Sequence, residues 1–161
     1  MKRMTWLGFF LFQIGLFQAQ SLDTIPLPSR FDGLERTLRV NHFPNPVDAT
    51  TDKDSKYNYL WKHTTSVLSP SEAVTIEACG AYIFYGGQWN LRINYGVKGF
   101  AKLFDCPKGK MKKGQPYTFK DNWRTANDLT GGWAMWYFIG TNEAGRKVYG
   151  VGKVYTSDQE N

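Results

Sequence analysis

The feature that most constrains the fold is a glycine pair, Gly86-Gly87, between two strand-like segments. Residues 73–85 and 88–95 are rich in aromatic and β-branched residues, which favour strands. Both glycines can adopt the positive φ that a tight hairpin turn requires. After the turn, apolar and polar residues alternate with the period of a half-buried strand: Trp89, Leu91, Ile93 and Tyr95 against Asn90, Arg92 and Asn94. The sequence therefore predicts a β-hairpin here.

Further short apolar segments separated by turn signals indicate about eight strands along the chain. They are expected at residues 37–40, 57–61, 99–104, 117–119, 133–141 and 147–155. Residues 48–56 and 120–132 are polar and are expected to form loops. The pattern predicts an all-β fold, a single-domain antiparallel β-sandwich or jelly roll, with a small β-barrel as the alternative.

The N-terminus has the layout of a secretory signal peptide. Lys2 and Arg3 precede a short apolar segment, and a small residue, Ala19, precedes the expected cleavage point. We therefore expect residues 1–19 to be a signal peptide, 20–56 an extended arm and loop, 57–156 the β-rich core, and 157–161 a polar tail. The protein is predicted to be exported to the periplasm or the extracellular space, with no transmembrane segment in its mature chain.

Export makes a disulfide chemically possible, because oxidising compartments allow such bonds to persist. The chain has two cysteines, Cys79 within a predicted strand and Cys106 just after another. A bridge would form if the two strands were neighbours. Two buried free thiols are the alternative, since cysteine packs as a small apolar residue.

The formal net charge is +6, and loss of Lys2 and Arg3 with the leader leaves about +4, too little to indicate nucleic-acid binding. Positive charge is concentrated in one loop, where four lysines lie within six positions: Lys108, Lys110, Lys112 and Lys113. This loop could contact phosphate or sulfate groups of an anionic surface, or it could simply keep the protein soluble.

The chain lacks the common motifs of catalysis. It contains no nucleophile elbow, no zinc-protease motif, no phosphate loop and no dinucleotide fingerprint. We therefore expect no cofactor, and the sequence favours a non-enzymatic protein. A cupin-like metal site using His42, His63 and a carboxylate such as Glu77 is the alternative, although the two histidines are 21 positions apart.

Aromatic and polar residues are interleaved in two parts of the chain. Such groups recognise sugars, because a flat ring covers the apolar face of a pyranose while amides, guanidinium groups and carboxylates bind its hydroxyls. The candidate ligand-binding residues are Trp89, Arg92, Asn122, Trp123, Arg124 and Asp128. Trp123 is the strongest candidate for an exposed ring, because its neighbours are polar and it lies in a predicted loop.

The leading hypothesis is an exported, non-catalytic protein that binds a carbohydrate or another component of the cell envelope. The metal-binding protein is the first alternative. An envelope protein that interacts with other proteins, as an assembly factor or inhibitor, is the second, because rings with one polar end also suit protein interfaces.

Overall fold

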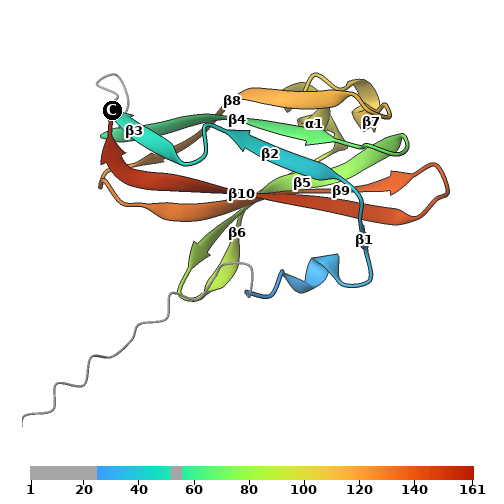
Figure 1. The fold of residues 1–161 in the computed structure, drawn as a ribbon, viewed down its shortest axis with the longest axis horizontal. Helices are drawn as coiled ribbons and strands as arrows, with labels where there is room; N and C mark the ends of the chain where they lie inside the picture. The colour runs from blue at the N-terminus through green and yellow to red at the C-terminus, as the bar shows by residue number, and fades with distance from the viewer. Residues whose placement is uncertain (1–24, 52–55) are drawn as a thin grey trace, which may run out of the picture.

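The computed structural model describes residues 25–51 and 56–161, and its architecture confirms the predicted all-β class (Figure 1). The strands form one curled sheet in the order β2-β4-β3-β10-β9-β5-β6, with β1 paired to β10, β7 to β5, and β8 to β4. Their bounds are β1 Glu35–Arg36, β2 Arg39–Phe43, β3 Val47–Thr51, β4 Tyr59–Leu68, β5 Val74–Tyr85, β6 Gln88–Gly96, β7 Lys110–Met111, β8 Pro116–Ala126, β9 Gly132–Asn142 and β10 Lys147–Glu160. The helices are η2 Ser29–Phe31, α1 Val97–Leu103 and η3 Pro107–Gly109.

The sheet folds over on itself to make two layers. In Figure 1, β8, β4 and β2 lie above β10, β9, β5 and β6. β3 joins the layers, because Thr50 and Thr51 pair with β4 while Val47 and Ala49 pair with β10. The result is a sandwich whose halves are continuous, as in a partial barrel. Most strand pairs are antiparallel, but β1 and β3 run parallel to β10.

The β5–β6 hairpin forms as predicted, and Gly86 and Gly87 have φ values of 61° and 79°. A bulge changes which side chains share a face. Ala81 pairs with Ile93 while Tyr82 pairs with Leu91, so Arg92 is the extra residue and the facing is reversed beyond it. The predicted four-residue apolar face is therefore divided: Trp89 lies on the outer face of this layer, and Tyr95 packs against the interior core.

The strand predicted at residues 99–104 is wrong, because this segment belongs mostly to the helix α1. Phe100 and Phe104 are four positions apart and therefore share one face of a helix. Their rings stack at 4.9 Å between centroids, and both side chains are buried in the interior core. Burial of both rings on one face removes a large apolar area from water. This stabilises a helical turn relative to an extended segment.

Three polar segments form strand where loops or a tail were predicted. β3 includes residues 48–51, and residues 52–55 of that predicted loop lie outside the described residues. β8 extends through residues 120–126, and β10 continues to Glu160. Strands with one face exposed to water tolerate many polar residues, so composition alone misclassified them.

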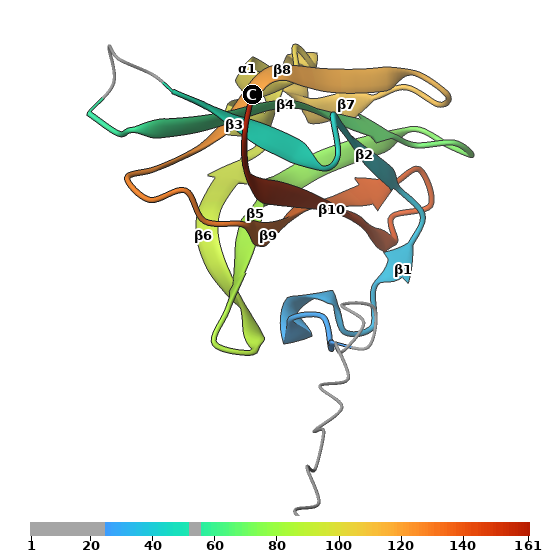
Figure 2. The same cartoon turned by 60° about the vertical axis from the view of Figure 1, so that its left-hand side comes forward.

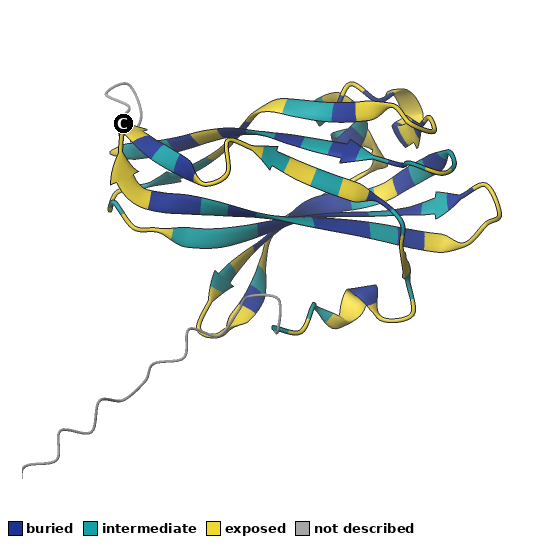
Figure 3. Cartoon of the chain, in the orientation of Figure 1, coloured by how far each residue is buried: buried dark blue, intermediate teal, exposed yellow. Residues whose placement is uncertain are grey.

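The main core lies between the two layers. Buried residues alternate with less buried ones along β4, whereas β5 and β9 each carry four consecutive buried residues, at 79–82 and 135–138 (Figure 3). The largest buried cluster includes Val67, Ile76, Trp136 and Phe138. A second interior cluster surrounds Trp61, which is fully buried near the β3 end of the sandwich.

A third cluster covers the outer, concave face of the lower layer. Residues 25–34, called the N-terminal strap below, lie across this face before the chain enters β1 (Figure 2). Phe31 anchors the strap: its side chain is 5% exposed, its ring stacks on Tyr149 at 5.0 Å, and it meets Tyr137 edge-on at 5.8 Å. Arg30 adds a cation–π contact with Tyr137 at 4.7 Å.

The predicted disulfide between Cys79 and Cys106 is wrong. Both cysteines are free and fully buried, and both belong to the interior core. They act there as small apolar residues. Burial raises the pKa of Cys79 to about 12 and that of Cys106 to about 11, so neither thiol ionises near neutral pH.

We expect both thiols to be unreactive in the native protein. A disulfide-exchange reagent at pH 8 should label no cysteine until denaturant is added, after which it should label Cys79 and Cys106, because the thiolate is the reacting form. Failure to label the denatured, unreduced protein would indicate a bridge and contradict the structure.

Candidate functional site

A pocket of about 240 Å³ lies where the β5–β6 hairpin approaches β8, the start of β9 and the end of β10. We call it the Arg124 pocket, after the charged side chain that lines it. Its residues are Ile83, Phe84, Tyr85, Arg124, Thr130, Gly131, Gly132, Trp133, Ala134 and Thr156. The strands that contribute to it belong to the continuous sheet, and Thr130 and Gly131 come from the β8–β9 connection.

Arg124 is held in place by four contacts. One terminal nitrogen, Nη1, donates to the carbonyl of Thr130 at 2.7 Å and to the hydroxyl of Thr156. The other, Nη2, donates to Thr130 Oγ1 at 3.2 Å. The guanidinium also lies over the buried ring of Trp61, 4.3 Å from its centroid, and Trp61 is itself fixed by a hydrogen bond from Nε1 to the carbonyl of Ser157 at 2.9 Å.

The charge of Arg124 is partly desolvated and has no acidic partner among the described residues, where the ion pairs are Arg146–Glu35 and Lys147–Glu77. Burial lowers the pKa of Arg124 below its ordinary value, although an arginine stays protonated at any physiological pH. Its hydrogen bonds within the described chain use three of its five N–H donors. The remaining donors and the unbalanced charge suit an anionic group of a ligand.

The rest of the pocket is aromatic and apolar. Tyr85 stands at its rim with 77% of its side chain exposed, and Trp133, half-buried, is tilted against Tyr155 at 5.0 Å. Gly131 keeps the connection into β9 close to β10, because a Cβ there would lie 2.5 Å from the Tyr155 hydroxyl. The arrangement combines ring surfaces with one positive charge.

The residues predicted to surround Arg124 do not join it. Trp123 is its neighbour on β8 and therefore points to the opposite side of the strand, where its side chain is 57% exposed and meets Phe119 at 6.2 Å. Asn122 is buried and donates to Thr65 Oγ1 at 2.6 Å. Asp128 is exposed in the β8–β9 connection, two residues before Thr130.

The other two predicted ligand-binding residues lie on β6, in the lower layer. Trp89 is buried with Phe84, whose ring it meets edge-on at 5.3 Å, in the cluster beneath the N-terminal strap. Arg92 is exposed at the bulge. The structure thus separates the six predicted residues: Trp89 and Asn122 are buried, and of the six only Arg124 lines the pocket.

Sequence reasoning missed Tyr85, Thr130 and Thr156 as pocket residues. A signal was present in the Gly131-Gly132 pair before Trp133, since adjacent glycines beside an aromatic residue often permit a close approach of backbone. The pairing of Arg124 with Thr156, 32 positions away, depends on sheet topology and could not be foreseen.

The structure brings the two histidines together inside the sandwich, with ring centroids 5.6 Å apart. His42 Nδ1 lies 2.9 Å from Thr65 Oγ1, and Nε2 lies 3.1 Å from the carbonyl of Gly152. His63 is 5% exposed, and neither of its ring nitrogens makes a hydrogen bond of normal geometry, although the backbone of Trp61 lies close enough to oppose the lowering of its pKa. Burial lowers the pKa of each histidine to about 4, so both are neutral at pH 7.

The third member of the alternative metal set is engaged elsewhere. Glu77 accepts a hydrogen bond from Thr141 at 2.5 Å and pairs with Lys147. The hydrogen bond from Lys147 is the main reason that the pKa of Glu77 lies below its ordinary value. In residues 25–51 and 56–161, no group of three His, Cys, Asp or Glu side chains is placed to hold a metal ion.

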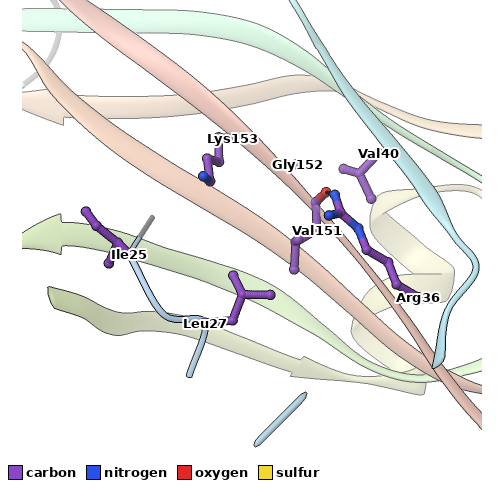
Figure 4. Close-up of a pocket in the computed structure, with 7 residues that line it drawn as sticks. All are labelled: Ile25, Leu27, Arg36, Val40, Val151, Gly152 and Lys153. Atoms are coloured by element: carbon purple, nitrogen blue, oxygen red, sulfur yellow. Dashed lines mark hydrogen bonds between the residues drawn. The ribbon is translucent and has the colours of Figure 1, made fainter. Parts of the chain in front are cut away.

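A larger gap of about 500 Å³ separates the N-terminal strap from β10 (Figure 4). Ile25 and Leu27 line it from the strap, and Val151 faces them from β10. Arg36 donates to the carbonyl of Val151 at 3.2 Å.

Comparisons with known proteins inform the fold alone. No protein-family model and no curated protein sequence matches the chain. A solved structure, Northeast Structural Genomics Consortium target SoR45, has a TM-score of 0.55 and 13% identity over 77% of this chain and 88% of that one. Spo0M, a sporulation control protein from Bacillus subtilis, has a TM-score of 0.31 and 8% identity over 75% and 49%, too weak a likeness to support an argument.

Among the described residues, no helix has the length and apolar character needed to cross a membrane.

Proposed function

We propose that this chain is an exported, non-catalytic binding protein whose Arg124 pocket takes an acidic carbohydrate, such as a uronic acid unit of an envelope polysaccharide. The observation that carries the proposal is a half-buried guanidinium with no acidic partner in the described chain, lining a pocket with aromatic walls. The N-terminal sequence, with its basic start and short apolar segment, supports export.

An acidic sugar has a group that would contact each part of this pocket. Its carboxylate would accept hydrogen bonds from the donors of Arg124 that the described chain leaves unused, and charge-assisted bonds of this kind are strong. Its ring would lie against Tyr85 or Trp133. The volume of about 240 Å³ is below that of typical drug-sized sites and suits a single sugar unit rather than a large cofactor.

The test is a comparison of methyl glucuronide with methyl glucoside, which differ in the charged group. Isothermal titration of the purified protein should give binding of the glucuronide at least about tenfold tighter, a difference of roughly 1.4 kcal/mol. Arg124→Met should abolish this preference, because it removes the charge and keeps much of the apolar stem.

Two further variants control for folding and for the neighbouring surface. Tyr85→Ala changes an exposed side chain at the pocket rim and should weaken binding several-fold without unfolding the protein. Trp123→Ala changes the opposite side of β8 and should leave the affinity unchanged. Equal affinity for the two sugars, or a folded Arg124→Met protein with unaltered preference, would refute the proposal.

A further inference from the structure

A second pocket, of about 560 Å³, lies between α1 and η3. Its floor is apolar, formed by Val97 and Ala101, and its rim carries Lys98, Lys102 and Lys108. We call it the lysine pocket. Lys98 and Lys102 are four positions apart on α1, so their side chains leave the same side of the helix.

The backbone holds the third lysine in an uncommon conformation. Lys108 has a φ of 57°, in the left-handed region that side chains rarely adopt. The next residue, Gly109, also has a positive φ, and a Cβ there would lie 2.7 Å from Val97 Cγ2 and 2.9 Å from the carbonyl oxygen of Ile76. The close packing of Gly109 against β5 and α1 therefore fixes the turn that presents Lys108.

Positive charge continues beyond the pocket along the same segment. Lys110, Lys112 and Lys113 follow η3 and are exposed. None of these six lysines forms an ion pair within the described residues, and Asp105, exposed at the end of α1, is the acidic residue of the segment. Like charges four positions apart weaken a helix, so Lys98 and Lys102 do not stabilise α1 themselves.

We propose that the lysine pocket binds the phosphate-bearing headgroups of an anionic lipid surface. The three ammonium groups would surround a lipid phosphate, and the outer lysines would contact neighbouring headgroups. The apolar floor favours a lipid over a soluble polyanion, because Val97, 38% exposed, can contact the glycerol and acyl carbons next to the phosphate. This site shares no residue with the Arg124 pocket and does not depend on it.

The test is co-sedimentation of the protein with phosphatidylcholine vesicles, with and without about 30% phosphatidylglycerol. Binding should require the anionic lipid and should fall steeply between about 0.1 M and 0.5 M salt, because screening shortens the reach of surface charges. Lys98→Glu/Lys102→Glu should weaken binding at least about tenfold. Lys98→Gln/Lys102→Gln should weaken it less, and it provides a milder change should the reversal unfold α1.

The matched control is Lys56→Glu/Lys62→Glu, which changes the net charge equally at two exposed lysines outside the lysine pocket. It should retain binding to within about twofold. Equal losses in the two reversals would show attraction by net charge alone, and binding of inorganic polyphosphate without binding to the anionic vesicles would identify a soluble polyanion; either result overturns the proposal. Arg124→Met should bind vesicles normally, so failure of the sugar proposal would be visible separately.

Discussion

Acidification from pH 7 to pH 4 is expected to lower the free energy of unfolding by about 3 kcal/mol for each of two histidines, the half-buried His42 and the buried His63. Burial lowers both pKa values from 6.5 to about 4. For His42 a hydrogen bond to the carbonyl of Gly152 opposes this effect and the nearby ring of His63 adds to it. For His63 the backbone of Trp61 opposes it. The folded protein therefore binds fewer protons than the unfolded chain between these pH values.

The sign follows from this difference. Protons that bind the unfolded chain preferentially favour unfolding. The free energy of unfolding is therefore highest above pH 6.5 and falls as the pH drops toward 4. Below about pH 4 the two histidines lower it little further. Two charged rings 5.6 Å apart in the interior would also repel each other. Urea unfolding measured at several pH values should reveal the slope, and a flat profile between pH 6.5 and pH 4 would contradict it.

Two substitutions distinguish the contributions of the two histidines to stability. His63→Leu should leave stability at pH 7 unchanged or raised, since the buried ring nitrogens it removes make no hydrogen bond of normal geometry, and it should reduce the pH slope. His42→Leu should cost about 1–3 kcal/mol at pH 7, because it removes two hydrogen bonds, one to Thr65, which keeps its bond from Asn122, and one to the Gly152 carbonyl. Equal effects of the two changes at pH 7 would contradict the hydrogen bonding described here.

The second large effect is expected at Gly80, next to the bulge of the β5–β6 hairpin. A Cβ at this position would lie 2.0 Å from the carbonyl oxygen of Ile93 and 3.0 Å from the ring of Tyr137. Because the first contact is with backbone, no side-chain movement can relieve it. Gly80→Ala should therefore cost about 3 kcal/mol or more, measured by thermal or urea unfolding.

Gly96→Ala is the matched control on the same pair of strands. Gly96 has φ −83° and ψ −173°, an extended conformation open to any residue, and a Cβ there would come no nearer than 4.0 Å to the carbonyl of Glu77. Its cost should stay within about 0.5 kcal/mol. A tolerated Gly80→Ala would mean that the backbones of β5 and β6 do not approach this closely beside the bulge, and would contradict the structure there.

The predictable parts of the fold are those decided by local pattern. Gly86-Gly87 predicts its turn because glycine, having no Cβ, readily adopts the positive φ that the turn requires. The alternating residues that follow predict the hairpin. The bulge at Arg92 was not predictable, since it depends on which residues of β5 are opposite. The helix α1 was missed because Phe100 and Phe104 fit either a strand or a helix until their shared burial is known.

The candidate site was only partly predictable for a related reason. Arg124 was identified from its polar and aromatic neighbours, but those neighbours were assigned to a loop, in which Trp123 and Arg124 could have faced one ligand. In the strand β8 they face opposite sides. The residues that complete the pocket, Tyr85 and Thr156, come from β5 and β10 and reach Arg124 only through the curl of the sheet.

Binding of an acidic sugar in the Arg124 pocket is tested most directly by a crystal structure of the protein soaked with methyl glucuronide. We expect the carboxylate within about 3 Å of a guanidinium nitrogen of Arg124, with the sugar ring against Tyr85 or Trp133. A sugar bound elsewhere, for example against Trp123, with the Arg124 pocket unoccupied, would contradict it.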